Sequence, residues 1–353
     1  KSPGPDEIPN AFLKRYALWC AKYLTLIYNL SLSTGLLPDD WKTSIVKPLH
    51  KQGDKHLIAN YRPIALTCTC CKLLEHVIYK HVMKFLEANS VLSPAQHGFR
   101  HGFSTVTQLV EVIHDFASAI NNHTQIDAIF LDFTKAFDKL SHPKLLLKVS
   151  HILKNSTICN WIESYLTSRK QCVSFNQATS TMLPVSSGVP QGSVLGPLLF
   201  LLYINDIADN CNVKIRLYAD DCVIYSVINS INDQLQLNRE LHQLFQWCNT
   251  WQMSVNLKKS VVMSIANKTH IHSFDYTIDG TILSRVEHYK YLGLHIRSDL
   301  RWNDHITEIT NKGMSKLHYL KRSLRHSSCD TKLIAFKTLV LPILEYANIV
   351  WDP

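Results

Sequence analysis

The stretch Tyr218-Ala219-Asp220-Asp221 decides how the rest of this chain is interpreted. It lies between two apolar runs, residues 213–218 and 222–227, whose β-branched and aromatic residues predict two strands joined at an acidic tip. Two carboxylates about 4 Å apart repel each other by roughly 4 kcal/mol at an effective dielectric constant near 20. A bound divalent cation reverses the sign of that cost, so the pair predicts a metal site. The alternative is a hairpin tip that points into water, and these four residues alone leave both interpretations open.

A third aspartate strengthens the metal interpretation. Residues 127–132 form an apolar run that ends in Asp132, and residues 133–139 then turn towards a helix that begins near Ser141 and Pro143. Asp132 is therefore predicted at the end of a buried strand. Carboxylates at the ends of neighbouring strands are the ligands that a two-metal site requires. Either aspartate alone is weak evidence, whereas both on neighbouring strands would be much stronger.

Two other segments have the composition of ligand-binding loops. Residues 186–197 contain three glycines and two prolines, which let backbone approach a ligand closely, and Gln191 there offers both a donor and acceptors. Four basic residues surround a predicted hairpin that turns near Gly53 and could meet phosphate oxygens. These residues are Lys47, Lys51, Lys55 and Arg62. A tight loop before a buried helix, and a solvated basic turn, are the plainer alternatives.

The charge of the chain favours a polyanionic partner. The 353 residues include 37 Lys and Arg against 28 Asp and Glu, a net charge of +9. Between Arg297 and Lys337 there are nine basic and four acidic residues, so more than half of the excess lies in this segment. From Trp302 onward apolar residues recur at helical spacing, which predicts a basic helical region.

Cysteine usage and hydropathy favour an intracellular protein that does not enter a membrane. The ten cysteines lack the spacing of a disulfide framework, and Cys68 and Cys71 form a Cys-x-x-Cys pair without a companion pair, so we interpret them as structural. The apolar run 194–204 is shorter than the ~20 residues that span a bilayer and predicts a buried helix. The chain lacks an initiator methionine and ends in an apolar segment, so we expect a piece of a longer polypeptide.

Several motifs follow one another in a fixed order along the chain. They are Asn60-Tyr-Arg-Pro-Ile-Ala-Leu, Gln96-His-Gly-Phe-Arg100, Phe130-Leu-Asp-Phe-Thr-Lys-Ala-Phe-Asp138, Gly188-Val-Pro-Gln-Gly-Ser-Val-Leu-Gly-Pro197, the Tyr-Ala-Asp-Asp tip, Asn256-Leu-Lys-Lys-Ser260 and Tyr291-Leu-Gly293. In this order the chain resembles the reverse transcriptases of non-LTR, LINE-type retrotransposons, and is nearest to those of jockey-like elements. The match spans nearly the whole chain.

The resemblance implies a mixed α+β fold of the right-hand polymerase type. Fingers and a palm, an antiparallel sheet covered by helices, are expected within residues 29–297, after an N-terminal extension at residues 1–28. Residues 298–353 are expected to begin a helical thumb that is truncated here. An endonuclease domain, usual upstream in such elements, is expected in the full-length protein and is absent from this sequence.

The resemblance also implies an activity: RNA-directed DNA polymerisation, in which dNTPs are added to the 3′-hydroxyl of a DNA primer on an RNA template. Two Mg²⁺ ions, with Mn²⁺ as a possible substitute, are expected at Asp132 and Asp220. Asp221 is then the weaker metal ligand, and the backbone oxygen of Phe133 completes the metal site. Lys259 is expected to protonate the leaving pyrophosphate.

Further residues are implied to bind substrates. Phe137 is expected to exclude ribonucleotides by clashing at the 2′ carbon, and its alternative is an ordinary core aromatic. Arg62 and Lys51 are expected to bind the triphosphate, while Gln191 and Gly192 line the incoming nucleotide and the template. Contacts with nucleic acid are expected from Gln96, Arg100, Lys312 and Lys316.

Two competing interpretations remain at this point. One is a truncated or domesticated fragment that binds RNA without catalysis, and the intact Asp132, Asp220 and Asp221 argue against a loss of chemistry. The other is an RNA-templated RNA polymerase, which Phe137 disfavours. The resemblance places the protein in a cytoplasmic ribonucleoprotein and in the nucleus.

Overall fold

The computed structural model describes residues 3–51, 53–209, 211–267 and 271–352. The chain forms two compact units, and each is assembled from three separate segments of the sequence. The first unit comprises Lys1–Phe99, Phe133–Asp209 and Gln246–Ser254, and the second comprises Arg100–Asp132, Asn210–Phe245 and Val255–Pro353. Each unit therefore brings together residues that lie far apart in the chain.

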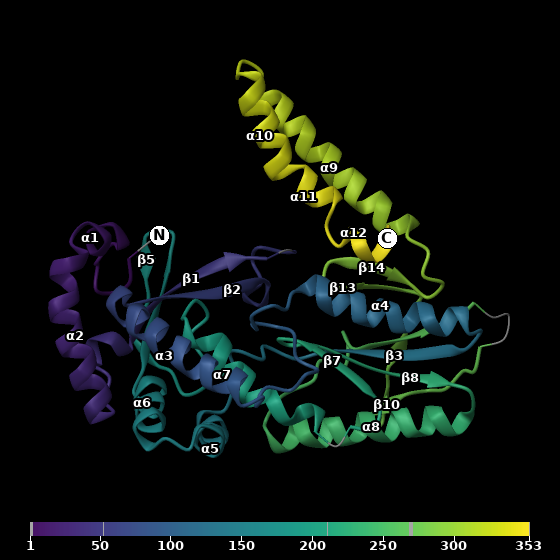
Figure 1. The fold of residues 1–353 in the computed structure, drawn as a ribbon, viewed down its shortest axis with the longest axis horizontal. Coiled ribbons are helices and arrows are strands. Elements are labelled where there is room, and N and C mark those ends of the chain that lie inside the picture. The colour runs from purple at the N-terminus through teal and green to yellow at the C-terminus, as the bar shows by residue number, and fades with distance from the viewer. Residues whose placement is uncertain (1–2, 52, 210, 268–270, 353) are drawn as a thin grey trace. The chain divides into compact units, whose positions relative to one another are not determined.

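A five-stranded sheet forms the centre of the second unit, with the strand order β12-β9-β3-β8-β7. The strands are β3 (Gln125–Asp132), β7 (Lys214–Tyr218), β8 (Asp221–Ile228), β9 (Val261–Ile265) and β12 (Ser284–Arg285). The central strand β3 pairs antiparallel with both β8 and β9. Two helices, α4 (Thr105–Asn121) and α8 (Ile231–Thr250), run along opposite faces of this sheet (Figure 1). The predicted antiparallel sheet covered by helices is confirmed.

Burial on both faces explains why β3 is apolar over nearly its whole length. Ala128 and Phe130 pack in a cluster with Leu109 and Phe116 of α4. Asp127 is fully buried among four polar side chains that donate hydrogen bonds to it. The donors are Gln125, Gln234, Ser264 and Tyr276, at 2.5–3.0 Å. The buried carboxyl group is thus surrounded by donors, as a polar group in a core requires.

Two hairpins follow the sheet in the second unit. The first joins β10 (Thr277–Ile278) to β11 (Thr281–Ile282), as the Asp279-Gly280 pair predicts. The second joins β13 (His288–Tyr291) to β14 (Leu294–Arg297). The sequence predicts one strand over residues 289–296, and this prediction is wrong because Leu292 and Gly293 have φ values of 45° and 89° and reverse the chain.

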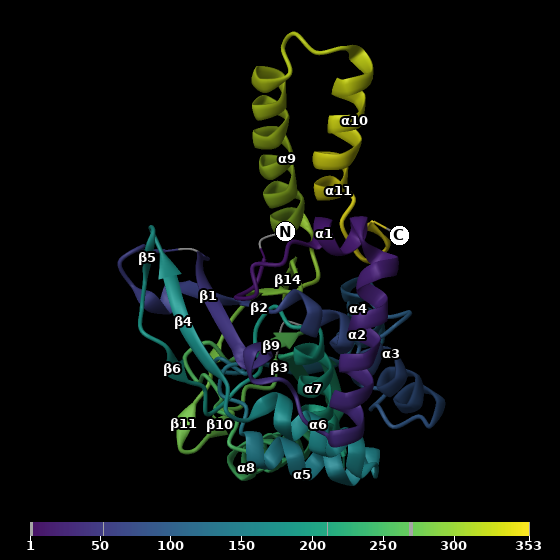
Figure 2. The ribbon, with the colours of Figure 1, turned by 90° about the vertical axis from the view of Figure 1, so that its left-hand side faces the viewer.

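Helices complete the second unit. They are α9 (Asn303–Ser323), α10 (Cys329–Leu339), α11 (Leu341–Leu344) and α12 (Asn348–Trp351). Figure 2 shows α9 and α10 side by side as an antiparallel pair. Gly313 permits a close approach to α11, because a Cβ there would lie 2.8 Å from a methyl carbon of Leu344. The predicted basic helical region is confirmed, and the apolar Val350 near its end is buried in the core of the unit.

The segment Cys329–Trp351 is long and apolar enough, by length and composition alone, to cross a membrane. Sequence analysis considered only the shorter run at residues 194–204 and missed this one. The segment is divided among α10, α11 and α12, with Pro342 near the start of α11 and a left-handed Ala347 before α12. The segment is therefore not one continuous helix. The absence of a membrane contact remains a prediction.

The first unit contains its own sheet, with the order β2-β1-β4-β5 and with β6 paired to β4. The strands are β1 (Thr43–His50), β2 (Tyr61–Thr67), β4 (Lys170–Phe175), β5 (Ala178–Thr179) and β6 (Leu183–Pro184). The β1–β2 pair is the predicted basic hairpin, and β1 also pairs parallel with β4. Sequence analysis assigned no element to residues 156–184, where the structure has α6 (Ser156–Leu166) and β4–β6.

The other helices of the first unit are α1 (Asn10–Arg15), α2 (Ala17–Thr34), α3 (Thr69–Ala88), α5 (His142–Leu153) and α7 (Leu195–Ile204), with short 3₁₀ segments η1 (Asp39–Lys42), η2 (Ile58–Asn60) and η3 (Asn205–Ala208). The predicted buried helix corresponds to α7. Its first turn is capped by Glu75, whose carboxylate accepts hydrogen bonds from the backbone of Val194 and Leu195 at 2.7 and 3.1 Å.

The predicted domain ranges stay predictions, and the structure shows only how they fall on its elements. The boundary between residues 28 and 29 lies inside α2, whereas the boundary between residues 297 and 298 lies between β14 and α9. The apolar spacing from Phe12 to Leu30 predicts a single helix, but the structure divides this segment into α1 and α2, and Tyr16 separates them.

Candidate active site

Strand register places three carboxylates together in the second unit. Asp132, the last residue of β3, pairs directly with Asp221, the first residue of β8. Tyr218 pairs with Asp221 to close the β7–β8 hairpin, so Ala219 and Asp220 form its two-residue turn. Ala219 has a left-handed φ of 55°, which is unfavourable for a residue with a side chain. The predicted acidic tip and its third aspartate are therefore neighbours in space.

The electrostatics of Asp221 reflect this arrangement. Desolvation, followed by the charges of Asp220 and then of Asp132, raises the pKa of Asp221 to about 6. Carboxylate oxygens are the ligands that Mg²⁺ prefers, and a divalent cation offsets mutual repulsion of this kind. The donor set and its charge therefore fit a divalent metal.

The loop that carries Lys259 is fastened to the backbone of Asp132. The backbone N–H of Asp132 donates to Ser260 Oγ at 3.2 Å, and its carbonyl accepts from the N–H of Asn256 at 2.7 Å. Ser260 Oγ in turn donates to the carbonyl of Asn256 at 3.0 Å. Lys259 itself is exposed. Lys259 is thus carried on a segment that is held to the end of β3 by hydrogen bonds.

Tyr289 on β13 is a neighbour of the carboxylates that sequence analysis missed. Its ring stacks on Phe130 of β3, with centroids 4.3 Å apart. Desolvation, and then the charges of Asp221 and Asp132, raise the pKa of Tyr289 to about 12. The motif at residues 291–293 marks the hairpin but not this side chain, because only the pairing of β13 with β14 and its packing on β3 bring Tyr289 there.

Phe137 lies in the first unit, within an aromatic group. Its ring stacks on Phe200 of α7 with centroids 4.3 Å apart, and it meets Phe99 edge to face at 6.1 Å. Phe137 is half-buried, so part of the ring is available to a ligand while the rest is packed. Phe133, four residues earlier, has a buried side chain, and only its backbone oxygen was predicted to act.

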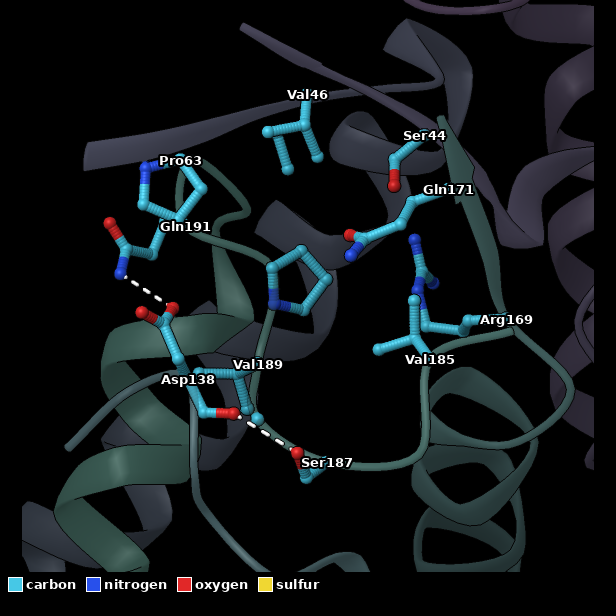
Figure 3. Close-up of a pocket in the computed structure, with 13 residues that line it drawn as sticks. Ser44, Val46, Pro63, Asp138, Arg169, Gln171, Val185, Ser187, Val189 and Gln191 are labelled. Carbon is cyan, nitrogen blue, oxygen red and sulfur yellow. Dashed lines mark hydrogen bonds between the residues drawn. The ribbon is translucent and has the colours of Figure 1, made fainter. Parts of the chain in front are cut away.

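The glycine-rich loop is held against two segments of the first unit. The N–H of Gly188 donates to the carbonyl of Leu140 at 2.7 Å, and a Cβ at Gly188 would lie 2.4 Å from the carbonyl oxygen of Asp138. A Cβ at Gly192 would lie 2.9 Å from the carbonyl oxygen of Ala65. The side chain of Gln191 donates to the carboxylate of Asp138 at 2.7 Å (Figure 3). Both glycines are therefore required by close backbone packing.

The two residues predicted to bind the triphosphate are exposed on the β1–β2 hairpin. Arg62 of β2 pairs with Leu49 of β1, and Lys51 directly follows β1. The N–H of Lys51 donates to the carbonyl of Asn60 at 2.9 Å, which closes the base of the loop. Both side chains are exposed to solvent.

The residues predicted to contact nucleic acid differ in their accessibility. Gln96 is only 2% exposed and accepts a hydrogen bond from the N–H of Gly98 at 2.7 Å, so it orders its own turn. Arg100 lies over the ring of Phe103, 4.7 Å from its centroid. On α9, Lys312 forms an ion pair with Glu308 at 2.7 Å, and Lys316 is half-buried.

The predicted site residues divide between the two units. The second unit holds Asp132, Asp220, Asp221, Lys259, Arg100, Lys312 and Lys316, and the first holds Lys51, Arg62, Gln96, Phe133, Phe137, Gln191 and Gly192. The structure brings the three carboxylates and the Lys259 loop together within one unit. The individual roles of these residues remain predictions.

A second group of possible metal ligands lies in the first unit. One oxygen of Asp6 and the sulfur atoms of Cys68 and Cys70 all lie within 4.8 Å of one another. Asp6 accepts hydrogen bonds at 2.9 Å from Cys68 Sγ and from the N–H of Thr69, at the start of α3. We interpret Asp6 as a cap of this helix. All ten cysteines, each in the described part of the chain, are free thiols, and their interpretation as structural stays a prediction.

Comparison with known proteins identifies one family. The family described as reverse transcriptase (RNA-dependent DNA polymerase) matches residues 49–296. The chain is 31% identical to a probable RNA-directed DNA polymerase from transposon X-element of Drosophila melanogaster, over 99% of this chain and 40% of that protein. It is 28% identical to the RNA-directed DNA polymerase from mobile element jockey of the same species, over 98% of this chain and 39% of that protein. The chain thus spans about 40% of the length of these curated relatives.

Solved structures with a similar fold include telomerases. The apo telomerase from Candida tropicalis has a TM-score of 0.54 and 11% identity, and the match covers 95% of this chain and 62% of that one. A form truncated from its C-terminal domain has a TM-score of 0.52 and 11% identity, and this match covers 80% of this chain and 59% of that one. The mixed α+β, right-hand polymerase fold predicted from the sequence is confirmed.

Proposed function

Because the chain belongs to the reverse transcriptase family, we propose that it is the polymerase part of a non-LTR retrotransposon protein, and that it extends a DNA primer with dNTPs on an RNA template. The relatives it resembles are named as RNA-directed DNA polymerases of mobile elements. The free thiols support an intracellular site of action, where such a protein would meet its RNA and its target DNA.

One observation carries the proposal: the register pair of Asp132 and Asp221, with Asp220 in the adjoining turn. Reverse transcriptases generally use divalent metal ions, and this carboxylate group fits two Mg²⁺ ions. Asp132 and Asp220 would hold both ions, and Asp221 would be the weaker ligand. When bound, the ions would polarise the primer hydroxyl and neutralise the charge that develops on the leaving pyrophosphate.

The chain's own residues would position the reactants. The backbone of Asp132 donates a hydrogen bond to Ser260 Oγ and accepts one from the N–H of Asn256, so the carboxylate is pre-organised before substrates bind. Lys259, on the same loop, would supply a proton to the departing pyrophosphate. Phe137 is packed between Phe200 and Phe99, and such a fixed ring suits exclusion of a 2′-hydroxyl.

Primer extension with the purified chain tests the proposal directly. We expect Mg²⁺-dependent incorporation of dNTPs on an RNA template annealed to a DNA primer. The Asp220→Ala variant should lose extension while it retains the affinity of the wild type for the primer-template duplex, measured in Mg²⁺-free buffer. Full activity of a correctly folded Asp220→Ala protein would refute the assignment of the metal site.

The same assay separates the alternatives. A domesticated RNA-binding fragment would bind the duplex but would not extend it with any nucleotide or metal. An RNA-templated RNA polymerase would prefer ribonucleotides over deoxynucleotides. Parallel reactions on RNA and DNA templates, with each nucleotide class, distinguish these outcomes from reverse transcription.

A further inference from the structure

A cavity of about 150 Å³ lies in the first unit (Figure 3). One wall is the sheet formed by β2, β1 and β4, and the other is the loop at residues 185–191. Six of its polar or charged lining residues are Ser44, Asp138, Arg169, Gln171, Ser187 and Gln191. One water needs about 10–15 Å³ on this measure of volume, so the cavity has room for a group the size of a phosphate.

Arg169 is the only cation in the lining of this cavity, all of which lies in the described part of the chain. It is 2% exposed, and its Nη1 donates to the carbonyl of Tyr165 at 3.1 Å. Its Nη2 is buried and has no hydrogen-bond partner among the described residues. A buried guanidinium with an unused donor is costly unless an acceptor reaches it.

Glu75 does not occupy the free donor of Arg169, although the two charges interact. The charge of Arg169 acts on Glu75, but the Glu75 carboxylate accepts the hydrogen bonds of the first turn of α7. In Figure 3 the guanidinium points towards the side chains of Gln171 and Ser44 at the cavity wall. The unused donor is thus directed at the cavity.

Strand geometry sets further donors beside the guanidinium. Ser44 of β1 and Gln171 of β4 are register partners, so their side chains stand next to each other. Arg169 precedes β4 and lies two residues from Gln171, so the two side chains share one face of the strand. A hydroxyl, an amide and a guanidinium converge there, a combination that suits phosphate oxygens.

The charges in the cavity lining favour a phosphodiester over a nucleoside triphosphate. Asp138 lies at the opposite end of the cavity from Arg169, where it accepts from Gln191 (Figure 3). One cation and one carboxylate suit a singly charged phosphodiester. A nucleoside triphosphate carries several negative charges, and Asp138 would repel it.

We propose that the cavity at Arg169 binds a phosphodiester of a single nucleic-acid strand, the unpaired part of the template. The identity of this strand rests on the proposed function, whereas the phosphate chemistry rests on the cavity alone. The site would hold the strand by its backbone, so it would be indifferent to base sequence.

Equilibrium binding without divalent metal or free nucleotide tests the inference. Fluorescence anisotropy compares a primer-template duplex that carries a 5′ template overhang with a blunt duplex, at several salt concentrations. We expect the overhang to strengthen binding by the wild type. The Arg169→Gln variant should lose about tenfold in affinity for the overhang duplex only, and its salt slope should fall by about 0.7.

A second variant tests the same site without removing the buried arginine, in case Arg169→Gln does not fold. Gln171→Glu places a carboxylate two residues from Arg169 on the same face, where it would pair with the guanidinium and compete with phosphate. We expect this variant to lose overhang affinity while its melting temperature stays the same or rises. Lys170→Gln removes an exposed charge one residue away, on the other face of the strand, and should leave the benefit of the overhang intact.

The outcomes are distinct. Unchanged overhang binding in both variants, or a wild type that binds both duplexes equally, overturns the inference. If the variants instead lose affinity only for a free dNTP, titrated separately, the phosphate belongs to the nucleotide and the assignment to the template is wrong. Failure of the wild type to extend a primer would refute the proposed function. The binding comparison would still test the phosphate site, because it does not depend on catalysis.

Discussion

The two units of the molecule hold their site residues in different ways. In the second unit, backbone pairing of β3 with β8 alone sets Asp132 opposite Asp221. In the first unit, Phe137 and Gln191 lie on irregular segments, and they are placed by a ring stack on Phe200 and by a hydrogen bond to Asp138. A change to a carboxylate should therefore affect function without loss of stability, whereas a change in the first unit should affect both.

The largest effect is expected when one charge is removed from the carboxylate group of the second unit. We expect Asp220→Asn to lower the rate of primer extension by about 10³-fold or more, equivalent to about 4 kcal/mol of transition-state stabilisation. Stability should be unchanged or higher, because the substitution relieves repulsion within the carboxylate group. Single-turnover kinetics and urea denaturation measure the two effects.

Two matched variants complete this test. Asp221→Asn should lose less activity than Asp220→Asn if Asp221 is the weaker ligand. Asp275→Asn changes an exposed aspartate of the same unit and should alter neither quantity. A folded Asp220→Asn protein with wild-type rates would contradict the proposed metal site.

In the first unit, we expect Phe137→Val to change selectivity and stability together. The shorter side chain opens space at the sugar, so discrimination between dNTP and rNTP, measured as the ratio of kcat/KM values, should fall about 10- to 100-fold. Loss of the stack on Phe200 should also lower the free energy of unfolding by about 1–3 kcal/mol.

Phe200→Leu separates these two effects, because it removes the same stack but leaves the ring of Phe137 in place. This variant should be destabilised to a similar degree and should retain discrimination. If Phe137→Val and the wild type select nucleotides equally, Phe137 is a core aromatic and not a sugar gate.

Acid should weaken the second unit through His305, which is 1% exposed. Its pKa is lowered to about 4, first by desolvation and then by the charges of His295, Lys290 and Lys312. The charge of Glu308 acts in the opposite direction and raises the pKa. The unfolded value is about 6.5, so the stabilising contribution is present above pH 6.5 and is lost as pH falls towards 4. Between pH 7 and pH 5 the loss should be about 2 kcal/mol.

Urea denaturation at these two pH values measures the loss, with His305→Gln as the reference that cannot titrate. The difference in unfolding free energy between pH 7 and pH 5 should be smaller in this variant than in the wild type. An equal difference in both proteins would show that other groups dominate the acid response.

The smallest effect is expected at the hairpin turn. Ala219 adopts a left-handed φ, which costs about 1–2 kcal/mol, whereas glycine accepts this conformation at an entropic cost of about 0.5–1 kcal/mol. Ala219→Gly should therefore raise the unfolding free energy by about 0.5 kcal/mol. A destabilised variant would mean that the buried methyl group of Ala219 contributes more than the turn strain costs.

Sequence patterns predicted the elements whose signals are local. The apolar run before Asp132, the acidic pair after Tyr218 and the Asp279-Gly280 turn each lie within a few residues, and the strands and turns formed as expected. The pattern around Leu292 failed, because an apolar stretch with one glycine is compatible with either a strand or a tight hairpin. The positive φ values at Leu292 and Gly293 show that this stretch is a tight hairpin.

Among the site residues, too, only those with a local sequence signal were predicted. Asp132, Asp220 and Asp221 were predictable because their positions follow from where strands end. Tyr289, which lies near these carboxylates, and Arg169, with its unused donor, carried no local signal. Their surroundings are formed by segments distant in the chain, and only packing reveals which polar atoms are left without a partner.

By itself, the sequence determined the strand ends that bear the carboxylates, the glycines of the loop at residues 188–192 and the basic character of α9. The tertiary structure decided which carboxylates face each other, which rings fix Phe137 and which arginine is buried beside a cavity. The physical reason is range: backbone preference and hydrophobic periodicity act over a few residues, whereas strand register, burial and charge proximity depend on contacts between residues that are far apart in the chain.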